Sequence, residues 1–354
     1  MIIGVSSADW RGPAQSADGT EFWGATGWVR LGQWLPYWAE HHEVHHGVLW
    51  AKHDHLEIET HHPDGSSTFV TPDVVYLHLY QEDLVPVLRA AKAYGQVLVQ
   101  DLDDWYWGLD SRNQAWQNAL TSRQSFSANL AESHVITTST PYLAERLAER
   151  FPADIVQIPN FIDVHRFAPV DHDVDVPTIG WVGATESRSG DLGELKGTLG
   201  QLRGQAHFQH SGHLDGAPLF ADEVGLSPAE VRVRPRSSVV DYPSLLDFQI
   251  GLVPLRITPF NEAKSDLKGL EYAACGIPFV ASPSGVYRDL AAAWGDCVRV
   301  AKRPADAVKS LRRLLDLDTR MAAAEELRKR VLERHLTEGV RHHLDLFASL
   351  GALV

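Results

Sequence analysis

Short apolar runs alternate with helical patterns along the whole of this chain. In the first half, six runs have the length and the branched or aromatic side chains of buried strands, at 2–5, 44–49, 74–79, 97–100, 135–138 and 155–158. Helical patterns lie between them, at 27–40, 82–94, 113–132 and 141–150. Because parallel strands need long crossover connections of this kind, the alternation predicts a doubly wound α/β sheet.

The second half repeats this alternation. Its predicted strands lie at 178–182, 207–210, 231–234, 250–253, 278–281 and 298–300. Its predicted helices lie at 190–199, 242–248, 265–274, 286–293 and 304–315, and residues 319–350 are mostly helical in pattern. The polar, proline-containing stretch 168–177 is predicted to link two domains. Ligands of such sheets bind at the carboxyl ends of the strands, so we expect the chemistry in a cleft where those ends face each other.

Composition excludes several classes of protein. The 354 residues are 44% hydrophobic and 22% charged, which is ordinary for a globular chain and excludes a wholly disordered or collagen-like one. No apolar run approaches the roughly 18 residues of a membrane span, and the first residues lack the pattern of a signal peptide. Two cysteines, Cys275 and Cys297, cannot form a disulfide framework or a four-thiolate zinc site. We therefore expect a soluble protein of the cytoplasm.

The negative charge is concentrated in the first half. Residues 1–170 hold 21 acidic and 10 basic side chains, a net charge of −11, whereas the whole chain carries −14. Nine of the 11 tryptophans also precede residue 120. Non-specific binding of double-stranded nucleic acid depends on basic side chains that neutralise phosphates, so the negative charge of this chain argues against it.

The most informative segment is 259–282, PFNEAKSDLKGLEYAACGIPFVAS. It is typical of a loop, a helix starting near Ser265, a tight turn at Gly276 and a strand. A helix N-terminus suits a diphosphate, and the carboxylate of Glu271 lies further along the same helix. Lys264 and Lys268 lie four residues apart on one face. From the spacing alone, a surface helix with solvated charges is the alternative.

Residues 264–282 resemble the donor-site segment of retaining GT-B glycosyltransferases, which take a sugar from a nucleotide-sugar. Three further segments agree with this family, of the family 4-like type, in the same order: 139–143 (STPYL), 158–167 (IPNFIDVHRF) and 179–183 (IGWVG). The resemblance implies two Rossmann-like domains facing a central cleft. It places an acceptor domain at 1–167, a nucleotide-sugar domain at 178–335 and a terminal segment, 336–354, whose helix packs back on the first domain.

The resemblance also implies roles for single residues of the donor domain. Glu271 would bind the ribose of the donor, and Gly183 would belong to the phosphate loop. A further set would contact the diphosphate or the sugar: Arg188, Asn261, Lys264, Ser265 and Lys268. Arg188 and Lys268 would stabilise the leaving group without a metal ion, and no cofactor beyond the donor is implied. The chain departs from the family at Ala263, where many members have a glutamate that contacts the sugar; backbone amides near Asn261 and Ser265 would replace it.

The segment 100–109, QDLDDWYWGL, ends a predicted strand with three carboxylates. Asp101 and Asp103 spell the D-x-D of metal-dependent glycosyltransferases. We reject a metal site because the motif lies in the half assigned to the acceptor. Solvated carboxylates before a capped helix are the structural alternative. We favour contacts to substrate hydroxyls, with Asp103 or Asp104 acting on the acceptor.

The loop that follows the first strand is the other acceptor-side candidate. Gly24 and Gly27 open a helix, and Arg30 is predicted to reach the cleft or, alternatively, to be solvated. Tryptophans in these two loops suggest a stacking floor for a sugar, peptide or flipped base: Trp23, Trp28, Trp105 and Trp107.

The motifs leave the acceptor open. We favour a protein or glycan hydroxyl. The segment 101–109, DLDDWYWGL, resembles glycosyltransferases of actinobacterial phages, which would place the enzyme in an infected host and make hydroxymethylated DNA an alternative acceptor. Trp105 and Trp107 would then stack the base, and Arg232, Arg234 and Arg236 would hold the backbone. The same motifs would also fit a catalytically silent sugar-binding module or a nucleotide-sugar epimerase.

Overall fold

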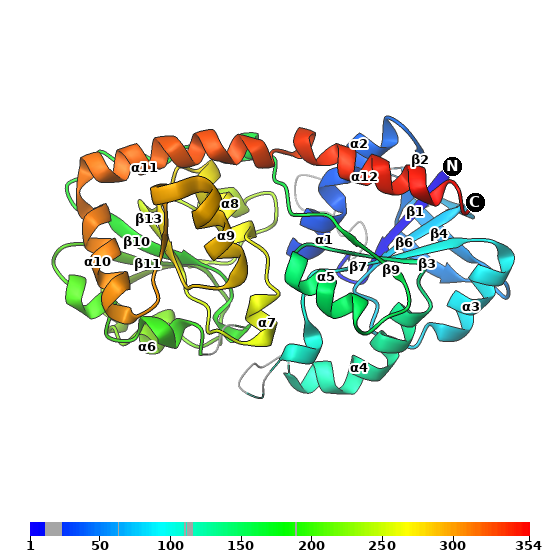
Figure 1. Cartoon of the computed structure of the whole chain (residues 1–354), viewed down its shortest axis with the longest axis horizontal. Helices are drawn as coiled ribbons and strands as arrows, with labels where there is room; N and C mark the ends of the chain where they lie inside the picture. Colours follow the sequence, from blue (N-terminus) through cyan, green and yellow to red (C-terminus); the bar gives the residue numbers. More distant parts are fainter. Residues whose placement is uncertain (11–22, 63, 110, 112–115, 188–189) are drawn as a thin grey trace. The chain divides into compact units, whose positions relative to one another are not determined.

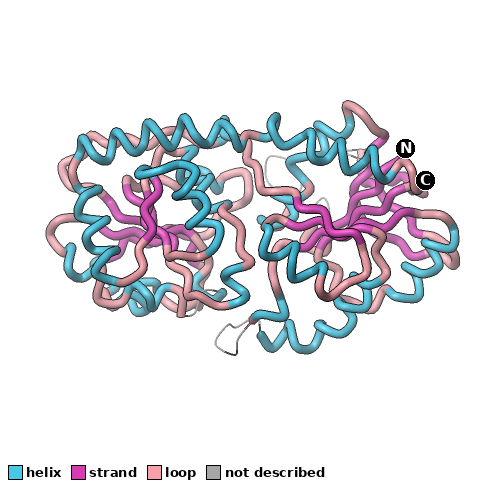
Figure 2. The backbone as a smooth tube through the Cα atoms, viewed as in Figure 1, coloured by secondary structure: helices cyan, strands magenta, loops and turns pink. Residues whose placement is uncertain are grey.

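The computed structural model describes residues 1–10, 23–62, 64–109, 111, 116–187 and 190–354 (Figure 1). The chain divides into two compact units. The first unit comprises Met1–Trp107, Asn118–Asn160 and Leu336–Val354, and the second comprises Gly108–Gln117 and Phe161–His335. In each unit the strands form an inner layer with helices around it (Figure 2).

The first unit is built on a six-stranded parallel sheet, as the sequence predicts. The strands follow one another in the order β2 (Glu43–His46), β1 (Ile2–Ser7), β6 (Val74–His78), β7 (Val97–Leu102), β8 (Val135–Thr138) and β9 (Asp154–Gln157). The central strands β6, β7 and β8 are buried along their full length, which explains their nearly continuous apolar runs.

The single strand predicted at 44–49 is wrong, because the chain turns at Gly47. β2 ends at His46, and β3 (Val48–Ala51) belongs to a separate antiparallel sheet, in which β4 (Leu56–His61) pairs with β3 on one side and with β5 (Ser67–Val70) on the other. Gly47 has φ +158°, and a Cβ there would lie 1.9 Å from the carbonyl oxygen of Glu59. Strands β4 and β5 were not predicted, because polar side chains alternate with the apolar ones and neither segment contains a continuous apolar run.

Helices surround the first sheet. The predicted helix at 27–40 is divided into α1 (Ala25–Arg30), η1 (Gly32–Trp34) and α2 (Leu35–Ala39). The other helical elements are α3 (Val85–Tyr94), η2 (Tyr106–Gly108), α4 (Trp116–Ala131), α5 (Pro141–Ala148) and α12 (Leu336–Leu350). Among the helices of the described ranges, none is long and apolar enough to cross a membrane.

The helix α12 is anchored in the first unit by aromatic contacts. The ring of His343 lies 4.4 Å from that of Trp34 and 5.0 Å from that of Trp38, between ring centroids. Phe347 packs edge-on against Trp38 at 5.1 Å. His343 is buried, and this burial, assisted by the charge of Arg30, holds its pKa well below the ordinary value.

We expect this histidine to make the first unit sensitive to acid. The pKa of His343 is lowered in the folded state, so the unfolded chain binds the proton first, and stability is lost as the pH falls below the ordinary value of 6.5. For each proton that the chain takes up on unfolding, the free energy of unfolding falls by up to about 1.4 kcal/mol per pH unit. In urea unfolding at pH 7.5, 6.5 and 5.5, His343→Phe should therefore show a shallower loss of stability than the parent. His342→Gln, on the exposed side of α12, is the control. Equal slopes for parent and His343→Phe would contradict this prediction.

The second unit contains the other predicted parallel sheet. Its strand order is β12 (Val231–Pro235), β11 (His207–His213), β10 (Thr178–Val182), β13 (Ile250–Val253), β14 (Phe279–Ala281) and β15 (Val298–Val300). The helices are α6 (Phe220–Val224), α7 (Pro259–Glu262), α8 (Leu267–Ala274), α9 (Gly285–Trp294), α10 (Pro304–Leu315) and α11 (Leu317–Arg330). One continuous apolar core joins these elements, with Trp181, Phe248, Tyr272 and Phe279 among its largest members.

Two predicted helices of the second unit are only short 3₁₀ turns. The segment 190–199 forms η5 (Leu192–Leu195) and, after Gly197 at φ +77°, η6 (Leu199–Leu202), while 242–248 is reduced to η8 (Tyr242–Leu245). The left-handed backbone of Gly197 interrupts the first of these helices. The remaining turns are η3 (Val164–Arg166), η4 (Thr185–Ser187), η7 (Pro228–Glu230), η9 (Gly295–Cys297) and η10 (Val331–Arg334).

Candidate functional site

In the second unit, the predicted phosphate loop begins at Gly183, directly after β10. Its φ is +151°, and a Cβ would lie 2.8 Å from the ring of Trp181, so glycine is required there. Its N–H donates to the carbonyl of Ser211 at 2.9 Å, and its carbonyl accepts from Nε2 of His210, also at 2.9 Å. The carboxyl end of β10 is therefore held in one conformation.

Lys268 reaches the same strand end from the first turn of α8. Its ammonium donates a hydrogen bond to the carbonyl of Val182, the last residue of β10, and lies 5.7 Å from the ring centroid of Trp181. The geometry brings a cation next to Gly183, where the sequence analysis expects a diphosphate.

Glu271 follows Lys268 by one helical turn. It is buried, and its Oε2 accepts a hydrogen bond of 2.6 Å from the phenol of Tyr242. Burial raises the pKa of Glu271, while Lys268, the Tyr242 hydrogen bond and Arg166 act in the opposite direction. Tyr242 and Arg166 are additions from the structure, since sequence reasoning assigned neither of them to the site.

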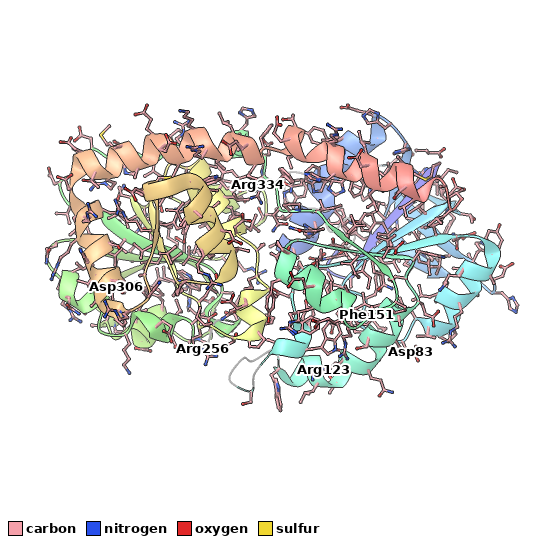
Figure 3. All side chains as sticks on the ribbon, in the orientation of Figure 1. Asp83, Arg123, Phe151, Arg256, Asp306 and Arg334 are labelled. Carbon is pink, nitrogen blue, oxygen red and sulfur yellow. The ribbon has the colours of Figure 1, made fainter. Side chains whose placement is uncertain are left out.

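The start of α8 differs from the expectation. The helix begins at Leu267, two residues after Ser265, and Asp266 occupies the N-cap. Arg334, labelled in Figure 3, donates to both carboxylate oxygens of Asp266 at 2.9 and 3.2 Å. The ammonium of Lys264 lies 4.3 Å from the ring centroid of Phe260. A carboxylate neutralised by arginine thus precedes the helix that was expected to open at Ser265.

The segment before α8 shows what replaces the family's first glutamate. Ala263 is completely buried. Glu262 does not take its place, because its Oε2 accepts from the N–H of Gly285 at 3.1 Å, at the start of α9, and from Arg288 at 3.4 Å. The backbone N–H of Asn261 donates to Oγ1 of Thr258 at 3.2 Å within the α7 cap, and the expected contact of amides near Asn261 and Ser265 with the sugar stays a prediction.

The side chain of Asn261 has a different function. Its amide donates to Oδ1 of Asp191 at 2.7 Å and to the carbonyl of Arg256 at 3.0 Å. Arg256 also donates its backbone N–H to Asp191 at 3.0 Å. These bonds connect the loop after β13 to the loop that contains Asp191. The predicted cation in that loop, Arg188, lies outside the described residues.

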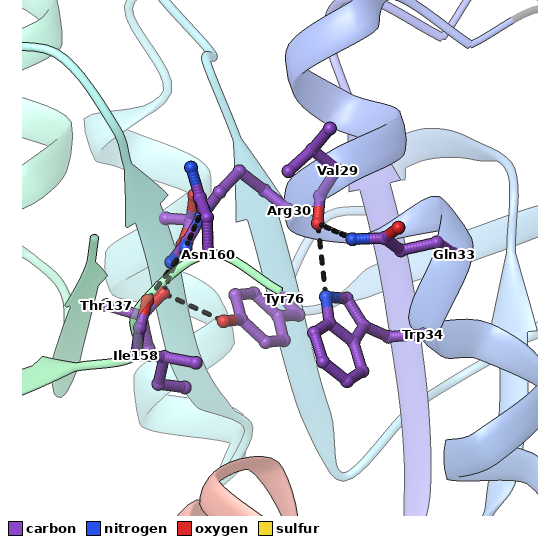
Figure 4. A network of polar contacts seen from close by, with 9 residues as sticks. Val29, Arg30, Gln33, Trp34, Tyr76, Thr137, Ile158 and Asn160 are labelled. Carbon is purple, nitrogen blue, oxygen red and sulfur yellow. Dashed lines mark hydrogen bonds and ion pairs between the residues drawn. The ribbon is translucent and has the colours of Figure 1, made fainter. Parts of the chain in front are cut away.

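In the first unit, polar side chains form a row across the carboxyl ends of four strands. Register pairs Ser7 with His78, His78 with Asp101, and Asp101 with Thr137. Figure 4 shows the part of this row around Arg30. Strand ends of a parallel sheet are where ligands bind, so this row is the natural candidate for the acceptor side.

Arg30 and Asp101 form a buried ion pair in this row. Arg30 Nη2 lies 2.8 Å from Asp101 Oδ1, and the two side chains are 4% and 0% exposed. Thr137 Oγ1 donates to the same oxygen at 2.6 Å, and Arg30 Nη1 donates to the carbonyl of Ile158 and to Asn160 Oδ1, both at 2.8 Å (Figure 4). The alternative of a solvated Arg30 is therefore wrong, because the side chain is buried against Asp101 and its neighbours, and a contact of Arg30 with the acceptor stays a prediction. Asp101 would also have to leave this pair to become a metal ligand.

The glycines of the next loop are explained by Asp9. Asp9 Oδ2 accepts from the N–H of Gly27 at 2.8 Å, and a Cβ on Gly24 or Gly27 would lie 2.3 or 2.1 Å from the carboxylate. The glycines thus permit the approach of a carboxylate of the same chain, and a ligand is not needed to explain them. Ser7 Oγ donates to Asp9 Oδ1 at 2.5 Å and lies 2.7 Å from Nδ1 of His78.

His78 was missed by the sequence analysis. It is completely buried, and burial lowers its pKa, so the ring is neutral at pH 7. Its Nε2 has no hydrogen-bond partner among the described residues. The available signal was a histidine at the end of the apolar run VVYLH, where a buried strand reaches the sheet edge.

The predicted aromatic floor is only partly open. Trp107 stacks on Phe126 at 6.2 Å, donates Nε1–H to Ser127 at 3.2 Å and has the guanidinium of Arg150 4.7 Å from its ring centroid. Trp105 lies against it at 4.8 Å. Trp23 is buried, and Asp103 and Asp104 are partly buried beside Trp105. Trp107 is therefore a packing residue and is not an open stacking surface.

The predicted basic strip on β12 is partly neutralised. Arg234 Nη1 lies 2.8 Å and Arg232 Nη1 3.6 Å from Oδ2 of Asp247. Two of the three arginines that were expected to hold a DNA backbone therefore share one carboxylate.

Part of the chain is similar to known glycosyltransferases. Residues 233–344, which include Lys268 and Glu271, match the family model described as "Glycosyl transferase-like". The fold is similar to that of sucrose-phosphate synthase from Thermosynechococcus elongatus, with a TM-score of 0.72, 14% identity and complete coverage of both chains. The chain has the GT-B fold, and the part that matches the family model is glycosyl transferase-like.

Other solved structures of this glycosyltransferase fold agree. HepE of Anabaena, solved in complex with UDP-glucose, has a TM-score of 0.67 and 14% identity, with 99% of each chain covered. TarM has a TM-score of 0.57 and 12% identity over 82% of this chain and 63% of its own. No curated protein gives a significant match.

Proposed function

We propose that this protein is a glycosyltransferase that moves a sugar from a nucleoside-diphosphate sugar to a hydroxyl group, and that the second unit binds the donor. The observation that carries the proposal is that α8 holds both Lys268, whose ammonium contacts the end of β10, and the buried carboxylate of Glu271 one turn further along. Such an arrangement suits a diphosphate followed by a ribose. The UDP-glucose named for HepE supports a donor of this class.

The chemistry needs stabilisation of the leaving diphosphate. The bond from the anomeric carbon to the diphosphate breaks, and negative charge develops on the leaving oxygen. The acceptor oxygen forms the new bond to the anomeric carbon, and the proton of the acceptor hydroxyl passes to the leaving diphosphate. Lys268 and the loop at Gly183 would stabilise that charge, with Arg188 as a second cation. We infer a retaining reaction that needs no metal ion, as the sequence resemblance implies.

On the acceptor side we propose a protein or glycan hydroxyl. The charge of −11 over residues 1–170 would repel a polyanion, and Asp247 neutralises part of the β12 arginines. Asp103 or Asp104 would accept bonds from the acceptor. Phage origin stays a prediction.

A donor panel tests the proposal. Purified protein is incubated with UDP-, GDP- and ADP-sugars, with and without a mixture of glycan and peptide acceptors, and the released nucleotide is measured. We expect release from one donor class that persists in excess EDTA and falls about 100-fold in kcat for Lys268→Met. Lys309→Met, on α10, is the control.

The same assay distinguishes the competing functions. No release from any donor, with nucleotide binding intact, would indicate a silent module. Activity that disappears with EDTA and returns with manganese would make Asp101 and Asp103 metal ligands and contradict the metal-independent proposal.

A further inference from the structure

A short, well-fixed loop brings Tyr242 to Glu271. The loop leaves β12 at Pro235 and enters η8 at Tyr242. Within it, Ser238 Oγ donates to Asp241 Oδ2 at 2.8 Å, and the N–H of Tyr242 donates to the carbonyl of Ser238 at 2.9 Å. The ring of Tyr242 packs against the apolar core of the second unit. The phenol therefore has little freedom to move away from α8.

Arg166 fixes the same loop from another segment. Its Nη2 donates to the carbonyl of Val239 at 2.5 Å. Arg166 comes from η3, within the stretch 158–167 that resembles the family's hinge motif. Its charge also acts on Glu271, 105 positions further along the chain. Arg166 thus supports both partners of the tyrosine–carboxylate pair.

The two carboxylate oxygens of Glu271 have different surroundings. Oε2 accepts the phenol proton at 2.6 Å. Within the described part of the chain, no protein hydrogen bond is found at Oε1, and this oxygen is not fully enclosed. A carboxylate with one oxygen fixed cannot rotate freely, so the direction of the other oxygen is set before a ligand arrives.

We propose that Tyr242 is a positioning residue of the donor site, which holds Oε2 of Glu271 so that Oε1 is presented to the ribose hydroxyls of the nucleoside diphosphate. This inference rests on the proposed function of the second unit. It adds a residue to which nothing in the sequence pattern pointed, because Tyr242 precedes Glu271 by 29 positions and lies in a different element.

The same contact controls the ionisation of Glu271. The charged or titratable groups facing Glu271 are Lys268 on its own helix, Arg166 on η3, Tyr242 on η8, and Tyr272 and Cys275, which follow it in the sequence. The hydrogen bond from Tyr242 lowers the pKa of Glu271 against the opposing effect of burial. Removal of the phenol should raise this pKa, so that ribose binding is lost at a higher pH during acidification.

The test compares ribose and dideoxyribose ligands by calorimetry. The parent, Tyr242→Phe, Glu271→Gln and the control Tyr94→Phe are titrated with UDP, GDP, ADP and CDP between pH 5 and 8. The tightest of these is then compared with its 2′,3′-dideoxy form. Tyr94 is exposed on α3 of the first unit and does not contact Glu271.

We expect Tyr242→Phe to weaken binding of the ribonucleotide about 5- to 10-fold and binding of the dideoxy form by less than twofold. On acidification, Tyr242→Phe should lose affinity for the ribonucleotide at a higher pH than the parent does. Glu271→Gln should abolish both the preference for ribose and the loss of affinity at low pH. Tyr94→Phe should match the parent.

The possible results distinguish a failure of the role of Tyr242 from a failure of the proposed donor site. If the parent binds no nucleoside diphosphate, the proposed donor site is wrong and the role of Tyr242 falls with it. If the parent binds and Tyr242→Phe keeps its ribose preference and pH profile, only the inference about Tyr242 is overturned. An equal loss for ribose and dideoxyribose ligands would also overturn it, because such a loss is what a purely structural role predicts.

Discussion

Replacing Asp101 by alanine is expected to lower the free energy of unfolding of the first unit by about 3–5 kcal/mol. The carboxylate is completely buried and accepts from Arg30 and from Thr137 at 2.6–3.2 Å. Without it, the guanidinium of Arg30 remains buried without a counter-ion, which costs far more than the loss of an exposed pair. Urea unfolding followed by tryptophan fluorescence measures the effect, since nine of the 11 tryptophans precede residue 120.

Two controls make this prediction specific. Glu149→Ala breaks the exposed pair with Arg146 on α5 and should cost less than about 1 kcal/mol. The double variant Arg30→Met with Asp101→Leu removes both charges and should recover much of the stability lost in Asp101→Ala. An Asp101→Ala variant as stable as the parent would show that this pair does not hold the strand ends together.

Glu271→Ala is expected to weaken nucleoside diphosphate binding about thirtyfold, equivalent to about 2 kcal/mol. The reason is that the variant leaves the ribose hydroxyls without a charged acceptor and Tyr242 without its partner. Calorimetry at pH 7.5 with the nucleotide that the parent binds most tightly measures the change.

Glu325→Ala, an exposed glutamate of α11, is the matched control and should bind like the parent. Thermal unfolding establishes that both variants are folded. Unchanged affinity in a folded Glu271→Ala protein would rule out the assignment of α8 to the donor site.

In the second unit, a local sequence pattern predicted the order of the elements around Lys268 and Glu271. The segment 259–282 indicated a helix, a turn and a strand, and α8, the turn at Gly276 and β14 confirm this order. Lys268 and Glu271 lie on one helix, so the 3.6-residue period alone places them on neighbouring turns. The partner of Glu271 was not predictable in this way, because Tyr242 approaches from a 3₁₀ turn that the sequence suggested was a helix.

The first half shows the opposite case. Arg30 and the strand-end aspartates were recognised as unusual, but their roles were assigned to ligands. The structure instead pairs Arg30 with Asp101, 71 positions away, and explains Gly24 and Gly27 by the carboxylate of Asp9. A single sequence does not reveal which charged side chains neutralise each other, since Arg30 on α1 and Asp101 on β7 meet only in the packed fold.

The two parallel sheets and the helix that carries the donor-site candidates follow from the order of residues along the chain. Periodic burial of apolar side chains is a local property and is encoded within each segment. The packed fold was needed to show which polar groups are buried together: Asp101 with Arg30, Glu271 with Tyr242, and His78 with Ser7. Desolvated charges and hydrogen-bonding groups must find partners at short range, and those partners come from whichever strands and loops the fold places beside them.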